Sequence, residues 1–564
     1  MRKGKHALHM MLAVVALLAL FVSVAQAQTG LGTVKGTILD STGALVPGAR
    51  VTLTNDATGV ERSSQSSEVG VYEFPSVSIG NYTLTVEATG FKKFSGTFVL
   101  QAGQTVVIYP RMEVGTVDTL VEVTGAAPIL TTVGTDVSDV KDALRIQQLP
   151  LNGRDVRNLF NLTPGVEGGG VPRVNGLKVG SADMLLDGIS LVDRFGGGLR
   201  AGVSPGLDTI QEYRIETTGS GAQYSRPATI TLVTKSGTNE IHGGAFWTHR
   251  NNFGGLRARR RQDLFPPPGC AEAFCPPQYI RNEYGASAGG PVIKNKTFWF
   301  ASWEGQKLRE ARYAEAAMPT AAMWAGDFGQ AVTGEGDPIT IYDPYSSTAE
   351  GARTPFALNR IPSNMITEFG KTMQSVTAEP TLDVNPFLGY NFTTYYPNKT
   401  DYYSYTFKGD HVFSEKDNIS GRFTQTNFTN KLYGARFGYP KPGSTDGPGT
   451  GRTIATIYSM FARWNHIFSP ALLNEFQGSV NRAPKTSGTL ADDTDWPAKL
   501  GLPNPFGATG WPSIYTSEYQ FMYYGGWDAD NRKDENLTAY QVENNVTWIK
   551  GKHSMRFGFR GRQE

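Results

Sequence analysis

One segment of this chain has the residue types and spacing of a hydrolase nucleophile. Residues 285–289 read GASAG and match G-x-S-x-G, the pattern that surrounds the reactive serine of many hydrolases. That chemistry needs a strand, a sharp turn and a helix, with His and Asp later in the chain. Here small residues alternate within a strand-like stretch that runs on to Pro291. We therefore interpret Ser287 as a closely packed strand residue.

Metal chemistry is not indicated either. None of the seven histidines is followed by Glu three residues later, and H-E-x-x-H does not occur. The histidines of the later chain stand at no ligand spacing, namely His242, His249, His411, His466 and His553. We predict no catalytic residue, no metal and no cofactor, and so a protein that is not an enzyme.

The two cysteines, Cys270 and Cys275, lie in a proline-rich stretch over residues 266–277. In an oxidising compartment they would pair and close a short loop. Free thiols are the alternative, and two cysteines alone do not make a zinc site. A basic cluster precedes them, at Arg257, Arg259, Arg260 and Arg261. It would either contact an anionic ligand or lipopolysaccharide, or belong to a solvated loop.

The first 27 residues have the pattern of an export signal. Arg2, Lys3 and Lys5 precede an apolar stretch over residues 10–24, and residues 25–27 read AQA. Cleavage is expected between Ala27 and Gln28. An uncleaved anchor is the alternative, although the apolar stretch is short for a membrane span.

Composition favours an all-β protein. A formal net charge of +2 argues against a nucleic-acid-binding protein. Mean hydropathy is −0.30, which excludes a helical membrane protein. Aromatic residues make up 11% of the chain and there are 65 glycines, which fits strands, turns and aromatic girdles.

Residues 28–113 predict a small β-sandwich, because short alternating strands are separated by turns. The segments GTILD (36–40), PGARV (47–51), GVYEF (70–74), GNY (80–82) and GF (90–91) resemble the carboxypeptidase regulatory-like domain. The resemblance implies a transthyretin-like sandwich of the carbohydrate-binding-like kind. It does not imply peptidase activity, since that belongs to a separate zinc module.

Residues 114–238 predict an α+β unit with helices near 141–148 and 154–162 and strands near 184–189 and 213–217. The segments LPLNGRD (149–155), LTPGV (162–166), VNG (174–176), LLDGI (185–189), QEYRI (211–215) and ITLVTKSGTN (230–239) resemble the plug of TonB-dependent receptors, particularly the Oar-like group. The segment QYSRP (223–227) departs from that group, which puts the local turn in doubt.

Residues 239–564 predict about nine long amphipathic strands, joined alternately by short and long connections, as in a transmembrane β-barrel. The segments NEYG (282–285), FWF (298–300), DHVFS (410–414) and GKHS (551–554) resemble the Oar-like barrel. Barrels of such transporters have about 22 strands, so we expect either that this chain is truncated or that it cannot insert into a membrane alone. The alternative to a membrane barrel is a soluble array of β-sandwiches. In a barrel, the histidines are expected at girdle or lumen positions.

The segment between sandwich and plug is where the resemblance places the TonB box. The candidate residues are Thr119, Leu120, Val121, Glu122, Val123 and Thr124. An extended segment rich in β-branched residues can add as a strand to the edge of TonB, so that main-chain hydrogen bonds carry the pull. The alternative is the first strand of the plug or a simple linker.

The expected fold class is therefore mainly β: a transthyretin-like β-sandwich, an α+β plug and an incomplete antiparallel transmembrane β-barrel. The resemblance implies an outer-membrane receptor with its sandwich in the periplasm. Its partners would be TonB with the inner-membrane energising complex, outer-membrane lipid and an unknown extracellular ligand, such as a glycan, siderophore or peptide. The alternative is a surface protein of the same architecture that binds glycans or adheres without uptake.

Overall fold

The computed structural model describes residues 30–115, 120–122, 137–149, 151, 153–167, 171–192, 205–218, 224, 226–252, 278–349, 351–432, 451–489, 493–510, 512, 533–551 and 553–564. Strands dominate these residues, and the expected fold class is confirmed. Within the same ranges, no helix has the length and apolar character needed to cross a membrane.

The N-terminal unit is a β-sandwich. Its three-stranded sheet has the order β5 (Val71–Val77), β1 (Gly32–Thr37), β8 (Thr105–Val107). Its five-stranded sheet has the order β10 (Leu120–Glu122), β7 (Lys93–Leu100), β6 (Gly80–Glu87), β3 (Arg50–Asn55), β4 (Glu61–Gln65), and β2 (Leu39–Asp40) pairs with β9 (Arg111–Met112). Alternate residues are buried along β1 and β6, so one face of each sheet fills a shared core that includes Val34, Leu84 and Phe74.

The second unit, the plug, is built on a five-stranded sheet. Its order is β11 (Val137–Asp142), β16 (Ile210–Thr218), β17 (Ala228–Thr234), β14 (Ala182–Leu186), β15 (Ile189–Ser190). Smaller elements complete it: α2 (Ala143–Gln148), η1 (Val156–Leu162), η2 (Leu207–Thr209), and the pair β12 (Val166–Glu167) and β13 (Arg173–Val174). The helix expected from residue 141 begins at Ala143, because residues 137–142 pair with β16 instead. Every residue of β14 is buried, so this strand is covered on both faces.

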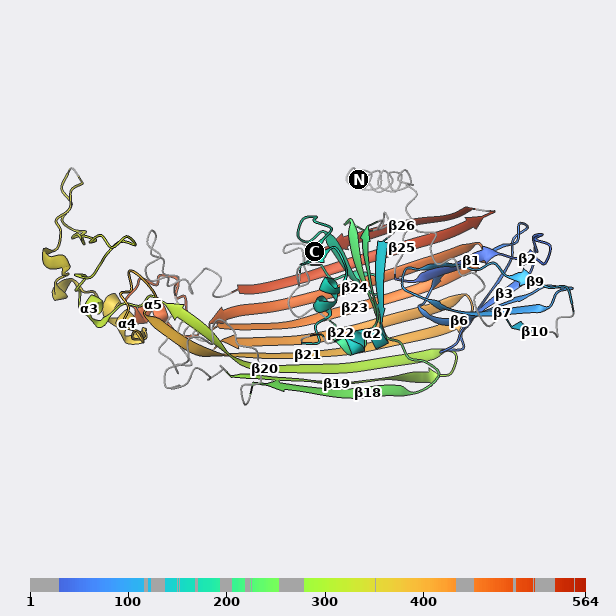
Figure 1. Cartoon of the computed structure of the whole chain (residues 1–564), viewed down its shortest axis with the longest axis horizontal. Coiled ribbons are helices and arrows are strands. Elements are labelled where there is room, and N and C mark those ends of the chain that lie inside the picture. The colour runs from blue at the N-terminus through green and yellow to red at the C-terminus, as the bar shows by residue number, and fades with distance from the viewer. Residues whose placement is uncertain are drawn as a thin grey trace, which may run out of the picture.

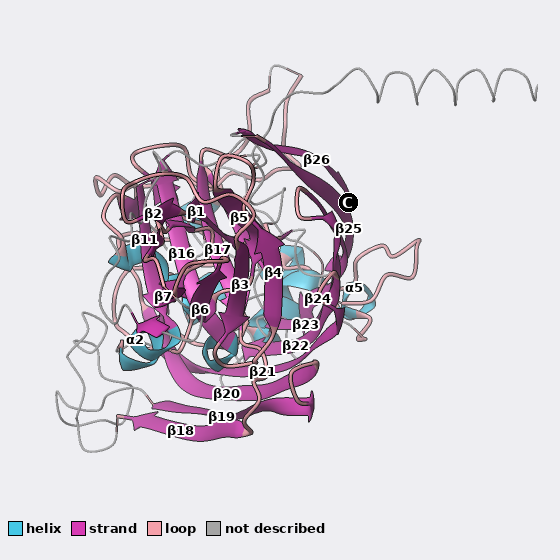
Figure 2. Ribbon diagram, turned by 90° about the vertical axis from the view of Figure 1, so that its right-hand side faces the viewer, coloured by secondary structure: helices cyan, strands magenta, loops and turns pink. Residues whose placement is uncertain are grey.

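The third unit is one antiparallel sheet of nine strands in chain order. They are β18 (His242–Asn251), β19 (Tyr279–Ile293), β20 (Thr297–Ala316), β21 (Phe392–Ser414), β22 (Asp417–Leu432), β23 (Gly451–Ser469), β24 (Leu472–Thr489), β25 (Lys533–Lys550) and β26 (His553–Gln563). The sheet curves into an open wall (Figure 2). Among the described residues, β18 and β26 are its two edges. Alternation in the sequence predicts strands over residues 296–308 and 401–413, and the corresponding β20 and β21 run well past these bounds on the side of the long connections.

The two faces of this wall differ in chemistry. On β23, Arg463 is buried on one face, whereas Met460 and Trp464 are exposed on the other. The exposed face carries large apolar side chains such as Phe407, whose exposed fraction is 57%. Apolar residues outward and polar residues inward with a period of two is the pattern of a membrane barrel.

The plug lies against the inner face of the wall, and the sandwich lies at the end where short turns join the strands (Figure 1). At the opposite end, the long connections carry α3 (Ala321–Trp324), η5 (Ala357–Asn359), η6 (Ser363–Met365), α4 (Glu368–Val376) and α5 (Trp496–Lys499). Met373 of α4 and Trp496 of α5 share a small core there, so two different connections pack together. The arrangement brings the sandwich into contact with both the plug and the wall, and the plug into contact with the wall.

Candidate functional site at the junction of sandwich, plug and barrel

Asp187 is a plug residue whose side chain reaches the barrel wall. It sits in the two-residue turn between β14 and β15, where Asp187 and Gly188 have φ values of 51° and 87°. Two positive φ values define a tight turn that favours Asp-Gly. The turn brings the Asp187 carboxylate against the Arg422 guanidinium of β22, and the Arg422 side chain is fully buried. The Asp187 carboxylate also accepts hydrogen bonds from the Thr234 backbone N–H (2.9 Å) and hydroxyl (3.1 Å).

Positive charge surrounds this carboxylate. Burial alone would raise the pKa of Asp187, but Arg422, Lys408 and Arg463 hold that pKa below its ordinary value. Asp187 therefore stays ionised and paired inside the junction. Removing one partner of a buried pair leaves an uncompensated charge, which costs about 3–5 kcal/mol.

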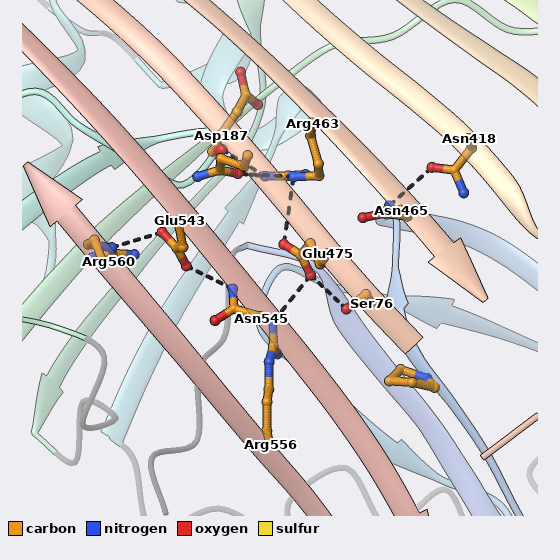
Figure 3. Close-up of polar contacts among 12 residues, drawn as sticks. Ser76, Asp187, Asn418, Arg463, Asn465, Glu475, Glu543, Asn545, Arg556 and Arg560 are labelled. Atoms are coloured by element: carbon orange, nitrogen blue, oxygen red, sulfur yellow. Dashed lines mark hydrogen bonds and ion pairs between the residues drawn. The ribbon is translucent and has the colours of Figure 1, made fainter. Parts of the chain in front are cut away.

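Arg463 of β23 connects the plug to the next strand of the wall. Its Nη2 donates to the backbone oxygen of Asp187 (2.8 Å) and to Gln477 Oε1 (2.9 Å). Its Nε lies 3.7 Å from Glu475 Oε1 on β24. Figure 3 shows Arg463 between Asp187 and Glu475. One guanidinium thus holds both the plug turn and a buried carboxylate of the wall.

Glu475 connects the wall to the sandwich. Its Oε2 accepts hydrogen bonds from Arg556 of β26 (3.2 Å) and from the hydroxyl of Ser76 (2.8 Å) (Figure 3). Ser76 belongs to β5 of the sandwich and has a φ of 52°, a conformation that costs a residue other than glycine on the order of 1 kcal/mol or more. A polar chain therefore runs from Ser76 through Glu475 and Arg463 to Asp187.

The wall continues this polar lining beside the junction. Glu543 of β25 accepts from Arg560 Nε (2.8 Å) and from Asn545 Nδ2 (2.9 Å). All three side chains point inward from neighbouring strands (Figure 3). The inner face is thus lined with paired charges, which a water-filled lumen or a polar plug can contact.

The sandwich also contacts the plug directly. The Ala102 N–H donates to Glu212 Oε1 (2.5 Å), and the Ala102 carbonyl accepts from Arg214 Nη1 (2.8 Å). Both partners lie on β16 and are buried. Burial raises the pKa of Glu212 to about 7 from an ordinary value of 4.5. This contact is therefore sensitive to pH near neutrality.

A third set of contacts ties the sandwich to the short-turn end of the wall. Asn239 donates through its backbone N–H to the Ala57 carbonyl (2.9 Å) and through Nδ2 to the Thr58 carbonyl (2.7 Å). Ser554 of β26 donates to Glu73 Oε1 (2.8 Å). Beside the Asn239 contacts lies a cavity of about 300 Å³, whose lining comes from all three units and includes Arg62, Tyr82, Asp187, Lys408, Phe461 and Arg463. The sandwich therefore contacts the plug and the wall around a cavity and not through a continuously packed interface.

A second cavity, of about 230 Å³, lies between plug and wall beside Arg154. Arg154 belongs to the LPLNGRD segment, pairs with Asp208 (2.7 Å), and stands 3.8 Å over the Phe246 ring. Glu304 of β20 accepts from the Asp208 backbone N–H (2.8 Å). The plug is therefore fixed to the wall here by a few polar contacts beside open space.

Of the site residues predicted from the sequence, the structure describes only Leu120, Val121 and Glu122. Leu120, Val121 and Glu122 form β10, which pairs with the sandwich strand β7 and not with the plug sheet. Thr119, Val123 and Thr124 lie outside the described residues, as do Ala27, Gln28, Cys270, Cys275 and the Arg257–Arg261 cluster. The TonB-box, disulfide and cleavage assignments stay predictions.

The G-x-S-x-G segment lies within β19 and is paired on both sides. Ser287 faces Gly244 on β18 and Ser302 on β20, so the strand–turn–helix of a nucleophile elbow is not formed there. The histidines are spread over the wall, where His411 bonds Thr297 (2.8 Å) and His466 bonds Asp417 (2.7 Å). These two hydrogen bonds each join neighbouring strands of the wall.

The junction itself was missed by sequence reasoning. Asp187 appears there only as part of the LLDGI segment, and its partners stand hundreds of positions away along the chain. A usable signal did exist. Arg422, Arg463, Glu475 and Glu543 occupy positions in long alternating strands whose other face is apolar, so they had to point toward the lumen.

Models of known protein families match two of these three units. The outer membrane beta barrel domain family matches residues 233–564, and the carboxypeptidase regulatory-like domain matches residues 33–113. The TonB-dependent transporter Oar of Myxococcus xanthus is 28% identical over 311 residues, which are 51% of this chain and 28% of that protein.

Solved structures show a weaker likeness. The outer membrane transporter YddB from Escherichia coli is 10% identical with a TM-score of 0.44, over 75% of this chain and 47% of that one. The ferric enterobactin receptor of Pseudomonas aeruginosa is 10% identical with a TM-score of 0.39, over 75% of this chain and 49% of that one. The chain thus spans less than a third of its Myxococcus relative and about half of each solved protein.

Proposed function

We propose that this chain, which belongs to the outer membrane beta barrel domain family, acts as a TonB-dependent receptor that binds a ligand outside the cell and passes it toward the periplasm. Its location is the outer membrane. Its Oar relative is named a TonB-dependent transporter. The long connections would then face the cell exterior, and the sandwich would lie in the periplasm.

The observation that carries the proposal is the position of the plug. Its sheet lies against the polar inner face of the wall and is held there by discrete polar contacts, namely the buried Asp187–Arg422 pair and the part-buried hydrogen bond from the Asp208 backbone N–H to Glu304. Among the described residues, separate polar contacts join the plug to the wall beside cavities, so the plug can be displaced without unfolding the wall. That is the arrangement that a mechanically opened path requires.

The ligand would be a glycan, a siderophore or a peptide bound on the exterior side of plug and wall. The cavity beside Arg154 offers charged and aromatic groups together, including Phe246, Glu304 and Tyr402. TonB, energised from the inner membrane, would pull on residues 119–124 and move the plug. Main-chain pairing would carry this force.

Val121→Pro tests the proposal, with Val121→Thr as its matched control. Proline removes the backbone N–H and is tolerated poorly in a paired strand, whereas threonine keeps a β-branched side chain. We expect Val121→Pro to abolish uptake of the ligand while leaving its binding to the cell surface intact, and Val121→Thr to retain both. Deleting residues 119–124 should match the proline variant.

A different result would favour an adhesive surface protein of the same architecture. In that case, wild-type cells would bind a glycan or matrix ligand without accumulating it. Removing residues 119–124 would then change neither binding nor uptake, and the transport proposal would be wrong.

A further inference from the structure

The segment Leu120–Glu122 forms an edge strand of the sandwich. As β10 it pairs in parallel with β7, with Leu120 opposite Lys93, Val121 opposite Phe94 and Glu122 opposite Ser95. The sheet order places β10 at the outside, next to β7 alone. One side of this strand is therefore satisfied by the sandwich, and the other side has no partner among the described residues.

The opposite edge of the same sheet is placed differently. Its last strand is β4, and Ser63 and Ser64 of β4 line a hollow together with Ser469, Pro470 and Ala471 of a short barrel turn. The barrel therefore stands beside that edge. Of the two edges of this sheet, the one formed by β10 is the edge at which a further strand can add.

We propose that the sandwich presents Leu120–Glu122 as a ready-made docking edge, and that the TonB strand adds to the outer side of β10 while β10 stays paired with β7. The inference rests on the proposed function, which makes residues 119–124 the TonB-binding segment. An unpaired edge strand is a template for strand addition, since its N–H and C=O groups already point outward in an extended backbone. Holding the segment extended in advance removes part of the ordering entropy that TonB capture would otherwise cost.

The proposal has a mechanical consequence. If β10 remains on β7, force applied at Val121 reaches the sandwich as well as the plug. The sandwich is in turn joined to the wall by Ser76–Glu475 and to the plug by Ala102–Glu212. Pulling would therefore load these contacts before or together with the plug contacts.

A reversible crosslink separates strand addition from strand exchange. The Ser95→Cys/Glu122→Cys pair joins residues in direct register on β7 and β10, within the reach of a disulfide. The variant is made in the full chain, with Cys270→Ser and Cys275→Ser so that no other thiol competes. Thr83→Cys/Thr97→Cys is the matched control, because it joins β6 to β7 in register and leaves β10 untouched.

The measurement is binding of purified TonB C-terminal domain to the membrane-embedded chain, oxidised and then reduced. We expect the oxidised Ser95→Cys/Glu122→Cys variant to bind TonB as tightly as its own reduced form, to within about twofold, since strand addition leaves β10 in place. The oxidised-to-reduced ratio of the control variant serves as the reference. Loss of binding on oxidation, restored by reduction, would show that TonB must strip β10 from β7 and would overturn the inference alone. Failure of the disulfide to form would overturn it as well. Absence of TonB binding in every variant and in the wild type would instead overturn the proposed function, and this inference with it.

Discussion

The hydroxyl of Ser76 donates a 2.8 Å hydrogen bond to Glu475, a residue 399 positions later in the chain. This contact joins the sandwich to the inner wall of the barrel. Because Glu475 also contacts Arg463, and Arg463 holds the backbone of Asp187, the same contact reaches the plug in two further steps. Sandwich, wall and plug are thus connected by one polar chain.

Ser76→Ala should weaken docking of the sandwich. It removes a donor to a buried carboxylate, and an unmade buried hydrogen bond costs about 1–3 kcal/mol. Ser76→Gly should cost less, because glycine adopts the positive φ at this position without strain. Ser78→Ala, on an exposed serine two residues on, serves as the control. Hydrogen exchange at the backbone amides of β5 measures the loss, and equal protection in all four proteins would refute the role given to Ser76.

Asp187→Ala should destabilise the plug more than Asp187→Asn. Alanine leaves Arg422 buried without its counter-charge, at a cost of about 3–5 kcal/mol. Asparagine keeps an acceptor for Thr234 and suits the positive φ of this turn. Adding Arg422→Met to Asp187→Ala should recover much of the loss. Thermal unfolding of the purified protein in detergent checks this order, and a double variant no better than the single one would contradict it.

Docking of the sandwich on the plug should weaken as pH rises. The pKa of Glu212 is raised to about 7 in the docked state from 4.5, so the docked state keeps a proton that the undocked state releases. Docking is therefore strongest below pH 4.5 and weakens as the pH rises from about 4.5 to 7. The total loss of docking free energy is up to about 3 kcal/mol, and docking is constant above that pH range. The protection factors of the backbone amides around Ala102, which compare the measured exchange rate with the intrinsic rate at the same pH, follow this change.

Glu212→Gln is the matched variant for that experiment. Its amide resembles the protonated acid and cannot ionise, so the protection factors around Ala102 should lose their pH dependence and stay at the low-pH level. A wild-type profile that is flat between pH 4.5 and 7 would show that Glu212 does not control docking.

Phe407→Arg should impair membrane insertion, whereas Phe407→Leu should not. Phe407 lies on the exposed, apolar face of the wall. A positive charge on the lipid face of a barrel costs about 2–4 kcal/mol at the bilayer midplane and less nearer its surfaces. The amount of protein recovered from outer-membrane fractions checks the prediction, and equal recovery of both variants would mean that this face does not meet lipid.

Much of the fold was predictable because, in a strand with one buried face, apolar side chains recur at every second residue. The alternation of Tyr403, Tyr405 and Phe407 with Ser404, Thr406 and Lys408 indicates a strand of the wall without further information. Boundaries were less accurate. Residues 137–142 pair with β16 although they precede a helix, and β21 begins at Phe392 because its partner β20 extends beside it.

The sequence by itself determined the units, their order and the outward or inward direction of most strand residues, since these follow from local periodicity and turn chemistry. Only the tertiary structure decided which residues meet. The side chains of Ser76, Asp187, Arg422, Arg463 and Glu475 gather because a sandwich, a plug turn and three barrel strands converge at one end of the wall. The edge position of Leu120–Glu122 on β7 is equally a product of chain folding. Pairing between distant segments depends on the register of whole sheets, and no local pattern encodes it.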